Sequence, residues 1–88
     1  MLPLSELLYV ESQNHNAVAC FPDRQEGFRI TLSEIERLLP ADLFCRCHHS
    51  FLVNMSHIRQ INRRALELDQ GSQIPVGRNY YETAQAKF

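Results

Sequence analysis

The stretch FCRCHHSFLVN, residues 44–54, decides how this chain folds. Its apolar ends, residues 44–47 and 51–53, predict two short strands, and the polar residues between them predict the turn that joins the strands. The turn contains two histidines and a serine, with an arginine just before it. Such side chains contact phosphates, bases, metal ions or acids, so the same stretch is the first candidate for a functional site.

Short apolar runs separated by polar turns continue on both sides of this hairpin. Polar turns are expected at residues 13–16, 69–72 and 77–79. The expected strands are residues 7–10, 17–21, 24–30, 58–62, 65–68 and 74–76. Gly27 marks a bulge or weak point in the third of these, and Pro75 predicts an edge strand because it has no N–H to donate. Many short strands with little helix indicate an antiparallel, mainly β domain.

One helix stands out at about residues 31–39. Thr31 and Glu34 have the spacing of a capping box, and Pro40 stops the helix. The helical spacing of its apolar residues predicts one face in the core: Leu32, Ile35, Leu38 and Leu39. Residues 80–88 predict a second, short helix at the C-terminus.

Length and composition bound the function. The chain has 88 residues, 44% hydrophobic residues and a net charge of −1, so we expect one small domain with one thin core. Charge is unevenly distributed: the first 44 residues hold seven acidic and three basic residues, and the remaining 44 hold six basic and three acidic. The second half can therefore meet a polyanion. No transmembrane run or signal peptide is visible, and the odd set of three cysteines indicates a reduced, cytoplasmic setting.

Metal binding and catalysis are the weaker interpretations of residues 45–49. A structural zinc site needs two ligand pairs from separate places, so we expect no metal and no cofactor. Cys47 and His48, as neighbours on a strand, point to opposite faces, so we expect no cysteine nucleophile and no enzyme. A redox-sensitive Cys47 stays open, because Arg46 and His48 nearby would favour its thiolate.

Nucleic-acid contact is the remaining interpretation. The three turns at residues 14–16, 48–50 and 77–79 carry asparagine, histidine, serine and arginine. These side chains suit base edges and phosphates. From spacing alone, ordinary solvated loops explain the same residues.

Several motifs, in order along nearly the whole chain, resemble the LytTR DNA-binding domain. The family pattern F-x-R-x-H-x-S-[FY]-x-V-N is similar to residues 44–54, and its later V-[SG]-R-x-[YF] segment to residues 76–80. Residues 7–11 and 31–35 are similar to an early strand and the helix of the family. The matching positions of the two main motifs are Phe44, Arg46, His48, Ser50, Phe51, Val53, Asn54, Ile58, Val76, Arg78 and Tyr80.

The resemblance implies an elongated stack of short antiparallel sheets that regulates bacterial transcription. It implies binding to direct repeats in double-stranded DNA, by loops that enter successive major grooves. By position, the base-reading residues are His15, His49 and Arg78. The expected backbone contacts are Arg46, His48, Ser50 and Asn79, and Cys47 is the candidate redox residue.

Residues 1–88 are expected to be a single domain of this kind that lacks the first strand or strands of the family. Family members usually follow a receiver domain in response regulators of two-component systems, so a receiver domain in the full-length protein is an expected partner. The missing strand would expose an edge for a homodimer. A second function class stays open: an interaction module that pairs with another LytTR regulator and antagonises it.

Overall fold

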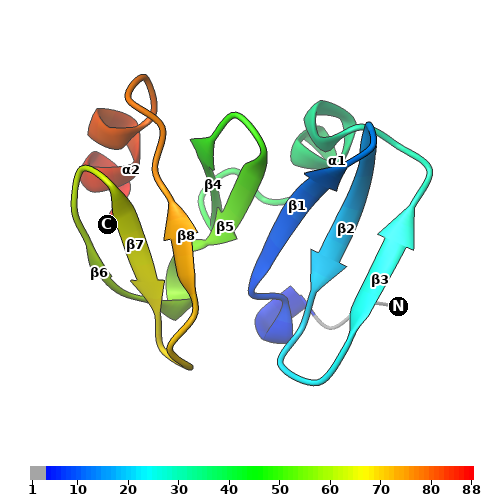
Figure 1. Cartoon of the computed structure of the whole chain (residues 1–88), viewed down its shortest axis with the longest axis horizontal. Coiled ribbons are helices and arrows are strands. Elements are labelled where there is room, and N and C mark those ends of the chain that lie inside the picture. The colour runs from blue at the N-terminus through cyan, green and yellow to red at the C-terminus, as the bar shows by residue number, and fades with distance from the viewer. Residues whose placement is uncertain (1–3) are drawn as a thin grey trace.

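The computed structural model describes residues 4–88, which form two antiparallel sheets covered by helices (Figure 1). This confirms the predicted mainly β fold with two helices. The elements, in chain order, are two 3-10 helices, two α-helices and eight strands: η1 (Leu4–Glu6), β1 (Tyr9–Gln13), β2 (Asn16–Cys20), β3 (Gln25–Phe28), α1 (Leu32–Leu38), β4 (Phe44–His48), β5 (Phe51–Asn54), η2 (Met55–His57), β6 (Ile58–Ile61), β7 (Ala65–Leu68), β8 (Gln73–Pro75) and α2 (Tyr81–Lys87).

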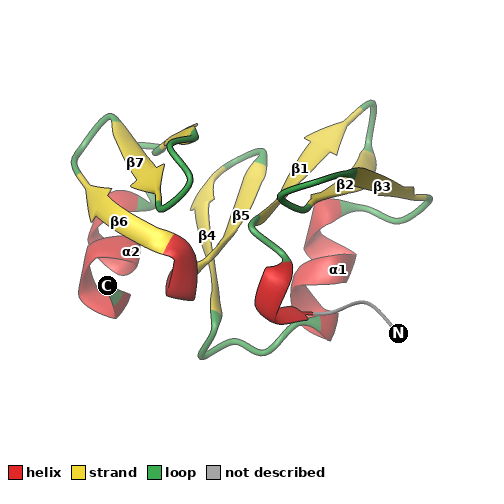
Figure 2. Cartoon of the chain, turned by 90° about the horizontal axis from the view of Figure 1, so that it is seen from below, coloured by secondary structure: helices red, strands yellow, loops and turns green. Residues whose placement is uncertain are grey.

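The two sheets lie side by side along the 30 Å long axis of the molecule (Figure 2). The larger has the strand order β3-β2-β1-β5-β4 and the smaller the order β6-β7-β8. α1 lies under the larger sheet and α2 beside the smaller one. The predicted hairpin of residues 58–62 and 65–68 is confirmed as β6–β7. Pro75 lies in β8 at an edge of its sheet, as its missing N–H required.

The β4–β5 hairpin stands between two hydrophobic cores. Alternate residues of a strand point to opposite faces, and the hairpin uses both. One face contributes to a first core under the larger sheet: Leu7, Val10, Ala17, Ala19, Phe21, Leu32, Ile35, Phe44 and Leu52. The other contributes to a second core, shared with the smaller sheet and α2: Leu8, Cys45, Cys47, Val53, Leu66, Leu68, Ile74, Val76 and Ala84.

α1 begins as the sequence predicts. The Thr31 hydroxyl accepts from the Glu34 amide at 3.1 Å, and Glu34 returns the contact to the Thr31 backbone, which completes the capping box. Leu32 and Ile35 are buried, but the prediction for Leu38 is wrong: it is 76% exposed. In a helix of seven residues the buried stripe is narrow, and Leu38 falls outside it. Within residues 4–88, neither helix is long and apolar enough to span a membrane.

The register shifts lie in β6 and β4 and not at Gly27. β3 pairs with β2 in unbroken register across Gly27. One shift occurs between Ile58 and Gln60, opposite β7. The other occurs between Arg46 and His48, opposite β5. An extra residue there bends the strand and turns its last side chains, so the irregularity falls next to the polar turn.

Asn54 is the buried polar anchor of the hairpin. Its side chain is fully buried, and its Nδ2 donates to the carbonyl oxygens of Leu7 at 2.8 Å and Leu4 at 3.3 Å. Its Oδ1 accepts from the Ser56 amide at 2.9 Å, which caps η2. The end of β5 is thereby tied to the segment that leads into β1.

His57 makes a second tie to the same N-terminal segment. Its Nδ1 lies 2.8 Å from Asp69 Oδ2, and its Nε2 lies 2.7 Å from the Ser5 carbonyl oxygen. Both partners are acceptors, so only the doubly protonated ring donates to both. Burial lowers the pKa of His57, but the contacts with Ser5 and Asp69 outweigh burial and raise it.

We expect Asn54→Ala to lower the free energy of unfolding by about 2 kcal/mol, because it leaves buried carbonyl and amide groups without their partner. Urea unfolding followed by circular dichroism measures the change. The control is Asn79→Ala at an exposed position, expected to change stability by less than about 0.5 kcal/mol. Equal midpoints for the two variants would contradict the role of Asn54.

We also expect stability to fall at high pH through His57. A pKa raised by folding adds stability that is fully present below the unfolded value of about 6.5 and is lost as pH rises through the folded pKa. The contribution is about 1 kcal/mol or less, because the pair is partly exposed. Urea midpoints between about pH 5.5 and pH 7.5 measure it, below the range in which the buried cysteines would ionise on unfolding. His57→Gln should flatten the profile, and parallel profiles for wild type and His57→Gln would contradict the role of His57.

Candidate nucleic-acid interface

Three loops lie along one edge of the molecule (Figure 1). Loop 1, Asn14 and His15, joins β1 to β2; loop 2, His49 and Ser50, joins β4 to β5; and loop 3, residues 76–80, follows β8. They follow one another along the long axis, at the top of Figure 1, and Figure 2 gives the same order. We call this the loop edge. The three turns that were candidates for nucleic-acid contact, at residues 14–16, 48–50 and 77–79, all lie on it.

Loop 1 is a two-residue hairpin turn with a left-handed backbone. Asn14 has φ of 50° and His15 has φ of 68°. Positive φ at both residues is typical of the tight turn that matches the twist of paired strands. A non-glycine residue in this region costs roughly 1–2 kcal/mol. The conformation fixes the direction in which the exposed His15 side chain leaves the turn.

Loop 2 is held in shape by Arg46. The guanidinium donates from Nε to the His48 carbonyl oxygen at 3.1 Å and from Nη2 to that of His49 at 2.7 Å. Its Nη1 donates to Glu36 Oε1 on α1, also at 2.7 Å. The Arg46 side chain is only 18% exposed. It therefore braces the loop from below, while the side chain of His49 stays exposed at the tip.

The side chain of His48, the last residue of β4, makes a further contact with loop 2. The Ser50 amide donates to His48 Nδ1 at 3.0 Å. In a neutral ring, this contact leaves the proton on Nε2, so His48 carries a fixed donor. The Ser50 carbonyl oxygen accepts from the Ser12 amide at 2.9 Å. That bond joins loop 2 to the strand that carries loop 1.

Loop 3 sits against the base of loop 2. The Gly77 amide donates to the Cys47 carbonyl oxygen at 2.8 Å, and the Tyr80 amide donates to the Gly77 carbonyl oxygen at 3.0 Å. A Cβ at Gly77 would lie 2.9 Å from Tyr80 Cδ2 and 3.6 Å from His48 Cα. A side chain at position 77 would therefore displace the Tyr80 ring, which favours glycine there. Arg78 and Asn79 are exposed on the loop.

Two surface hollows on the loop edge are lined by the predicted base-reading residues. One brings His15 and His49 together with Arg46 and the start of α1, and its lining residues are Ser12, His15, Thr31, Leu32, Ser33, Arg46 and His49. Arg78 lines the other, with Arg63, Arg64, Val76 and Tyr81. Of the predicted base-reading residues, two thus share a hollow and the third stands apart.

Arg63 and Arg64 are the functional candidates that the sequence pattern did not identify. The sequence places them at the turn between the strands expected at residues 58–62 and 65–68, and counts them among the basic residues of the second half. The available signal was an adjacent pair of arginines in a turn, followed by Arg78 on a neighbouring strand end. Recognising it required the β7–β8 pairing that brings these segments together.

The expectation for the Cys47 thiolate is wrong in direction. Burial raises the pKa of Cys47 to about 12, and Arg46 lowers it only slightly. The thiol is fully buried in the second core, and its Sγ lies near the carbonyl oxygens of Phe51 and Pro75, at 3.9 and 3.8 Å. Burial raises the pKa of Cys20 and Cys45 as well. Among residues 4–88, no cluster of three or more histidine, cysteine or carboxylate side chains has the geometry to hold a metal ion.

Comparison with known proteins gives one consistent result. The family model described as "LytTr DNA-binding domain" matches residues 1–88. The sensory transduction protein LytT of Enterococcus faecalis is 34% identical over 93% of this chain and 36% of that protein. The transcriptional regulatory protein BtsR of Salmonella typhi is 30% identical over 94% of this chain and 36% of that protein. The chain therefore spans about a third of the length of these relatives.

A solved structure gives the same result. It is the LytTr DNA-binding domain of a protein from Bacillus cereus that is described as a methyl-accepting/DNA response regulator. The TM-score is 0.89 and the sequence identity 31%, and the match covers 98% of this chain and 84% of that one.

Cys47 should resist thiol reagents in the folded protein. In a variant with Cys20→Ala and Cys45→Ala, which leaves Cys47 as the sole thiol, we expect reaction with an aromatic disulfide at pH 8 to be at least about a hundred-fold slower than in guanidinium chloride, because the thiolate is the reacting form. Absorbance of the released thiolate gives both rates. Rapid reaction in the folded state would contradict the buried, protonated thiol.

Proposed function

Since the chain belongs to the LytTr DNA-binding domain family, we propose that it binds double-stranded DNA sequence-specifically through loops 1–3 and thereby regulates bacterial transcription. Loops 1–3 enter successive major grooves on one side of the duplex. Direct repeats are the expected target. In the full-length protein, a receiver domain is the proposed source of the regulatory signal.

One observation carries this proposal: three exposed side chains suited to base edges stand on three braced loops of one edge. Those side chains are His15, His49 and Arg78. The left-handed turn of loop 1, the Arg46 brace and the Gly77 contact each fix one of the loops. Fixed loops lose little conformational entropy on binding, which favours specific contacts.

The dimensions limit how much DNA the loop edge can cover. The molecule is 30 Å long, so the loop edge fits within about one turn of B-DNA, roughly 34 Å. An arginine can pair bidentately with the O6 and N7 acceptors of guanine, and a histidine N–H can donate to either atom. We therefore assign base reading to Arg78, His49 and His15.

The four proposed backbone residues divide into two groups. Arg46 has its guanidinium engaged with Glu36 and with the carbonyl oxygens of loop 2, so its proposed role is to shape the loop that meets the backbone. His48 offers its Nε2 donor to a phosphate, and Ser50 and Asn79 offer a hydroxyl and an amide group. Phosphate contacts of this kind set the register of a protein on DNA without reading sequence.

Substitutions on the loop edge test the proposal. With a cognate repeat from selection on randomised duplexes, we expect Arg78→Ala to weaken binding by about 1–3 kcal/mol and to relax one guanine position. His49→Ala should relax a different position. Fluorescence anisotropy at several salt concentrations gives the dissociation constants.

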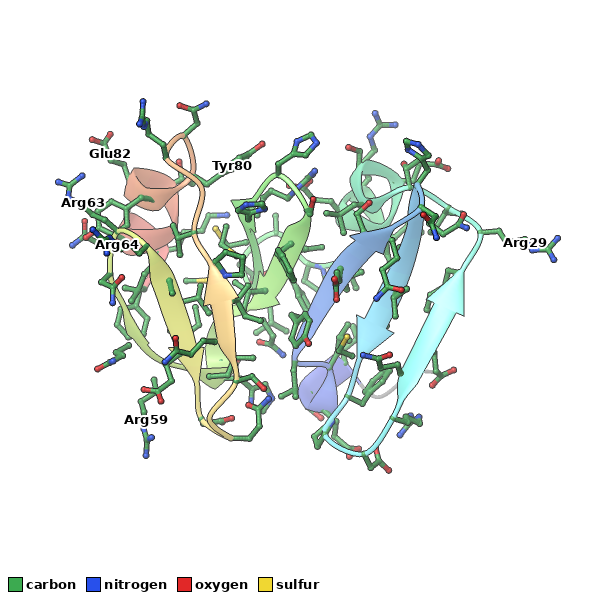
Figure 3. The ribbon with its side chains drawn as sticks, in the orientation of Figure 1. Arg29, Arg59, Arg63, Arg64, Tyr80 and Glu82 are labelled. Carbon is green, nitrogen blue, oxygen red and sulfur yellow. The ribbon has the colours of Figure 1, made fainter. Side chains whose placement is uncertain are left out.

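The matched control is Arg59→Ala, which removes the same charge at the far end of β6 (Figure 3). It should bind like the wild type. If Arg78→Ala and His49→Ala also bound like the wild type, reading by loops would be refuted. A stable homodimer without DNA affinity in low salt would favour the alternative function, in which the chain pairs with and antagonises another LytTR regulator.

A further inference from the structure

We propose that Arg63, Arg64 and Arg78 form a phosphate-binding hollow that grips the DNA backbone beside the base read by Arg78. The inference rests on the proposed function. It adds a contact region outside loops 1 and 2 and outside the hollow that His15 and His49 share. It assigns a role to the turn between β6 and β7, residues 62–64. We call this turn the arginine turn.

The arginine turn has a fixed backbone. Asn62 Oδ1 accepts from the amides of Arg64 at 2.9 Å and Ala65 at 3.0 Å. The Asn62 amide donates to the Ala65 carbonyl oxygen at 2.9 Å. An asparagine side chain that accepts from backbone amides two and three residues later holds the turn in one conformation. Arg63 and Arg64 are exposed on that turn.

A single backbone bond joins the arginine turn to loop 3. The Val76 amide donates to the Arg64 carbonyl oxygen at 2.9 Å. Arg78 follows two residues later, so Arg64 and Arg78 reach one hollow although fourteen positions separate them in the sequence. The same pairing of β7 with β8 that closes the small sheet therefore builds the hollow.

The Tyr81 ring restrains the side chain of Arg63. The Arg63 guanidinium carbon lies 4.9 Å from the centre of the Tyr81 ring. Stacking on an aromatic face restrains a guanidinium while its N–H groups stay free to donate. Figure 3 shows Arg63 and Arg64 at one end of the molecule, on the side of the C-terminal helix.

The three arginines of the hollow form no ion pair with another residue of the segment 4–88. Among residues 4–88, the ion pairs involve Arg24, Arg46 and His57, and none involves Arg63, Arg64 or Arg78. Glu82 lies on the same side of the molecule but within 4.0 Å of none of the three guanidinium groups. Like charges around one hollow repel one another, and a bound anion would relieve that repulsion.

A phosphodiester is the anion that best fits this site. Guanidinium groups match phosphate oxygens with paired N–H donors. Arg78 lines the hollow and also stands on loop 3, so a phosphate held there lies next to the nucleotide that Arg78 contacts. DNA-binding proteins commonly set their register on the duplex through such phosphate contacts, while contacts with base edges discriminate between sequences.

The test compares two changes on one hairpin. We expect Arg63→Ala/Arg64→Ala to weaken binding about ten-fold or more, equally for cognate and scrambled duplexes. We expect the slope of log Kd against log salt to fall by about 1 to 2, because fewer counterions are released. Arg59→Ala, on the same hairpin but away from the hollow, should leave both quantities unchanged. Circular dichroism verifies folding, and Arg63→Gln/Arg64→Gln replaces the alanine variant should that variant unfold.

Three outcomes would overturn the inference. In the first, the double variant has the same DNA affinity and salt slope as Arg59→Ala. In the second, it loses affinity for the cognate duplex alone, at an unchanged salt slope. In the third, inorganic phosphate shifts the amide resonances of residues 62–64 while the double variant binds DNA with normal affinity. The last would make the hollow a site for a small phosphorylated ligand. Arg78→Ala is measured alongside, so that loss of loop reading is distinguished from loss of the phosphate contact.

Discussion

The fold depends on the β4–β5 hairpin because it must satisfy two hydrophobic cores at once. Phe44 and Leu52 face one core, while Cys45, Cys47 and Val53 face the other. A shift of register by one residue would exchange the two faces and leave both cores wrongly filled. The hairpin therefore fixes how the two sheets sit relative to each other. Its polar turn sits in the middle of the loop edge for the same reason.

The fold was largely predictable because its signals are local. The capping box of Thr31 and Glu34 and the edge position of Pro75 follow from backbone hydrogen bonding within a few residues. Burial is less predictable, because it depends on what packs opposite. Leu38 has helical spacing but faces solvent, and Gly27 pairs regularly where a bulge was expected. Both errors come from tertiary context that a local pattern does not contain.

For the candidate site, the sequence located the polar turns, but not the contacts that individual side chains make. The three polar turns were found, but Arg46 proved to be a brace, because Glu36 and two carbonyl oxygens take up its donors. Cys47 looked activated beside Arg46, yet burial acts on its pKa more strongly than that neighbour does. The role proposed for Arg63 and Arg64 depends on the bond from the Val76 amide to the Arg64 carbonyl oxygen, which joins two segments of the chain. These differences come from side-chain direction and burial, which the folded chain sets through both neighbouring and distant residues.

The left-handed backbone at His15 has a consequence for how this surface can diverge. Glycine, asparagine, aspartate and histidine tolerate positive φ far better than β-branched residues do. The backbone conformation of the hairpin therefore limits which residue types can occupy position 15, independently of any ligand. His49 sits in a turn without that restriction. Among related chains, we expect few residue types at position 15 and many at position 49. New preferences for DNA sequence would therefore arise more readily through loop 2.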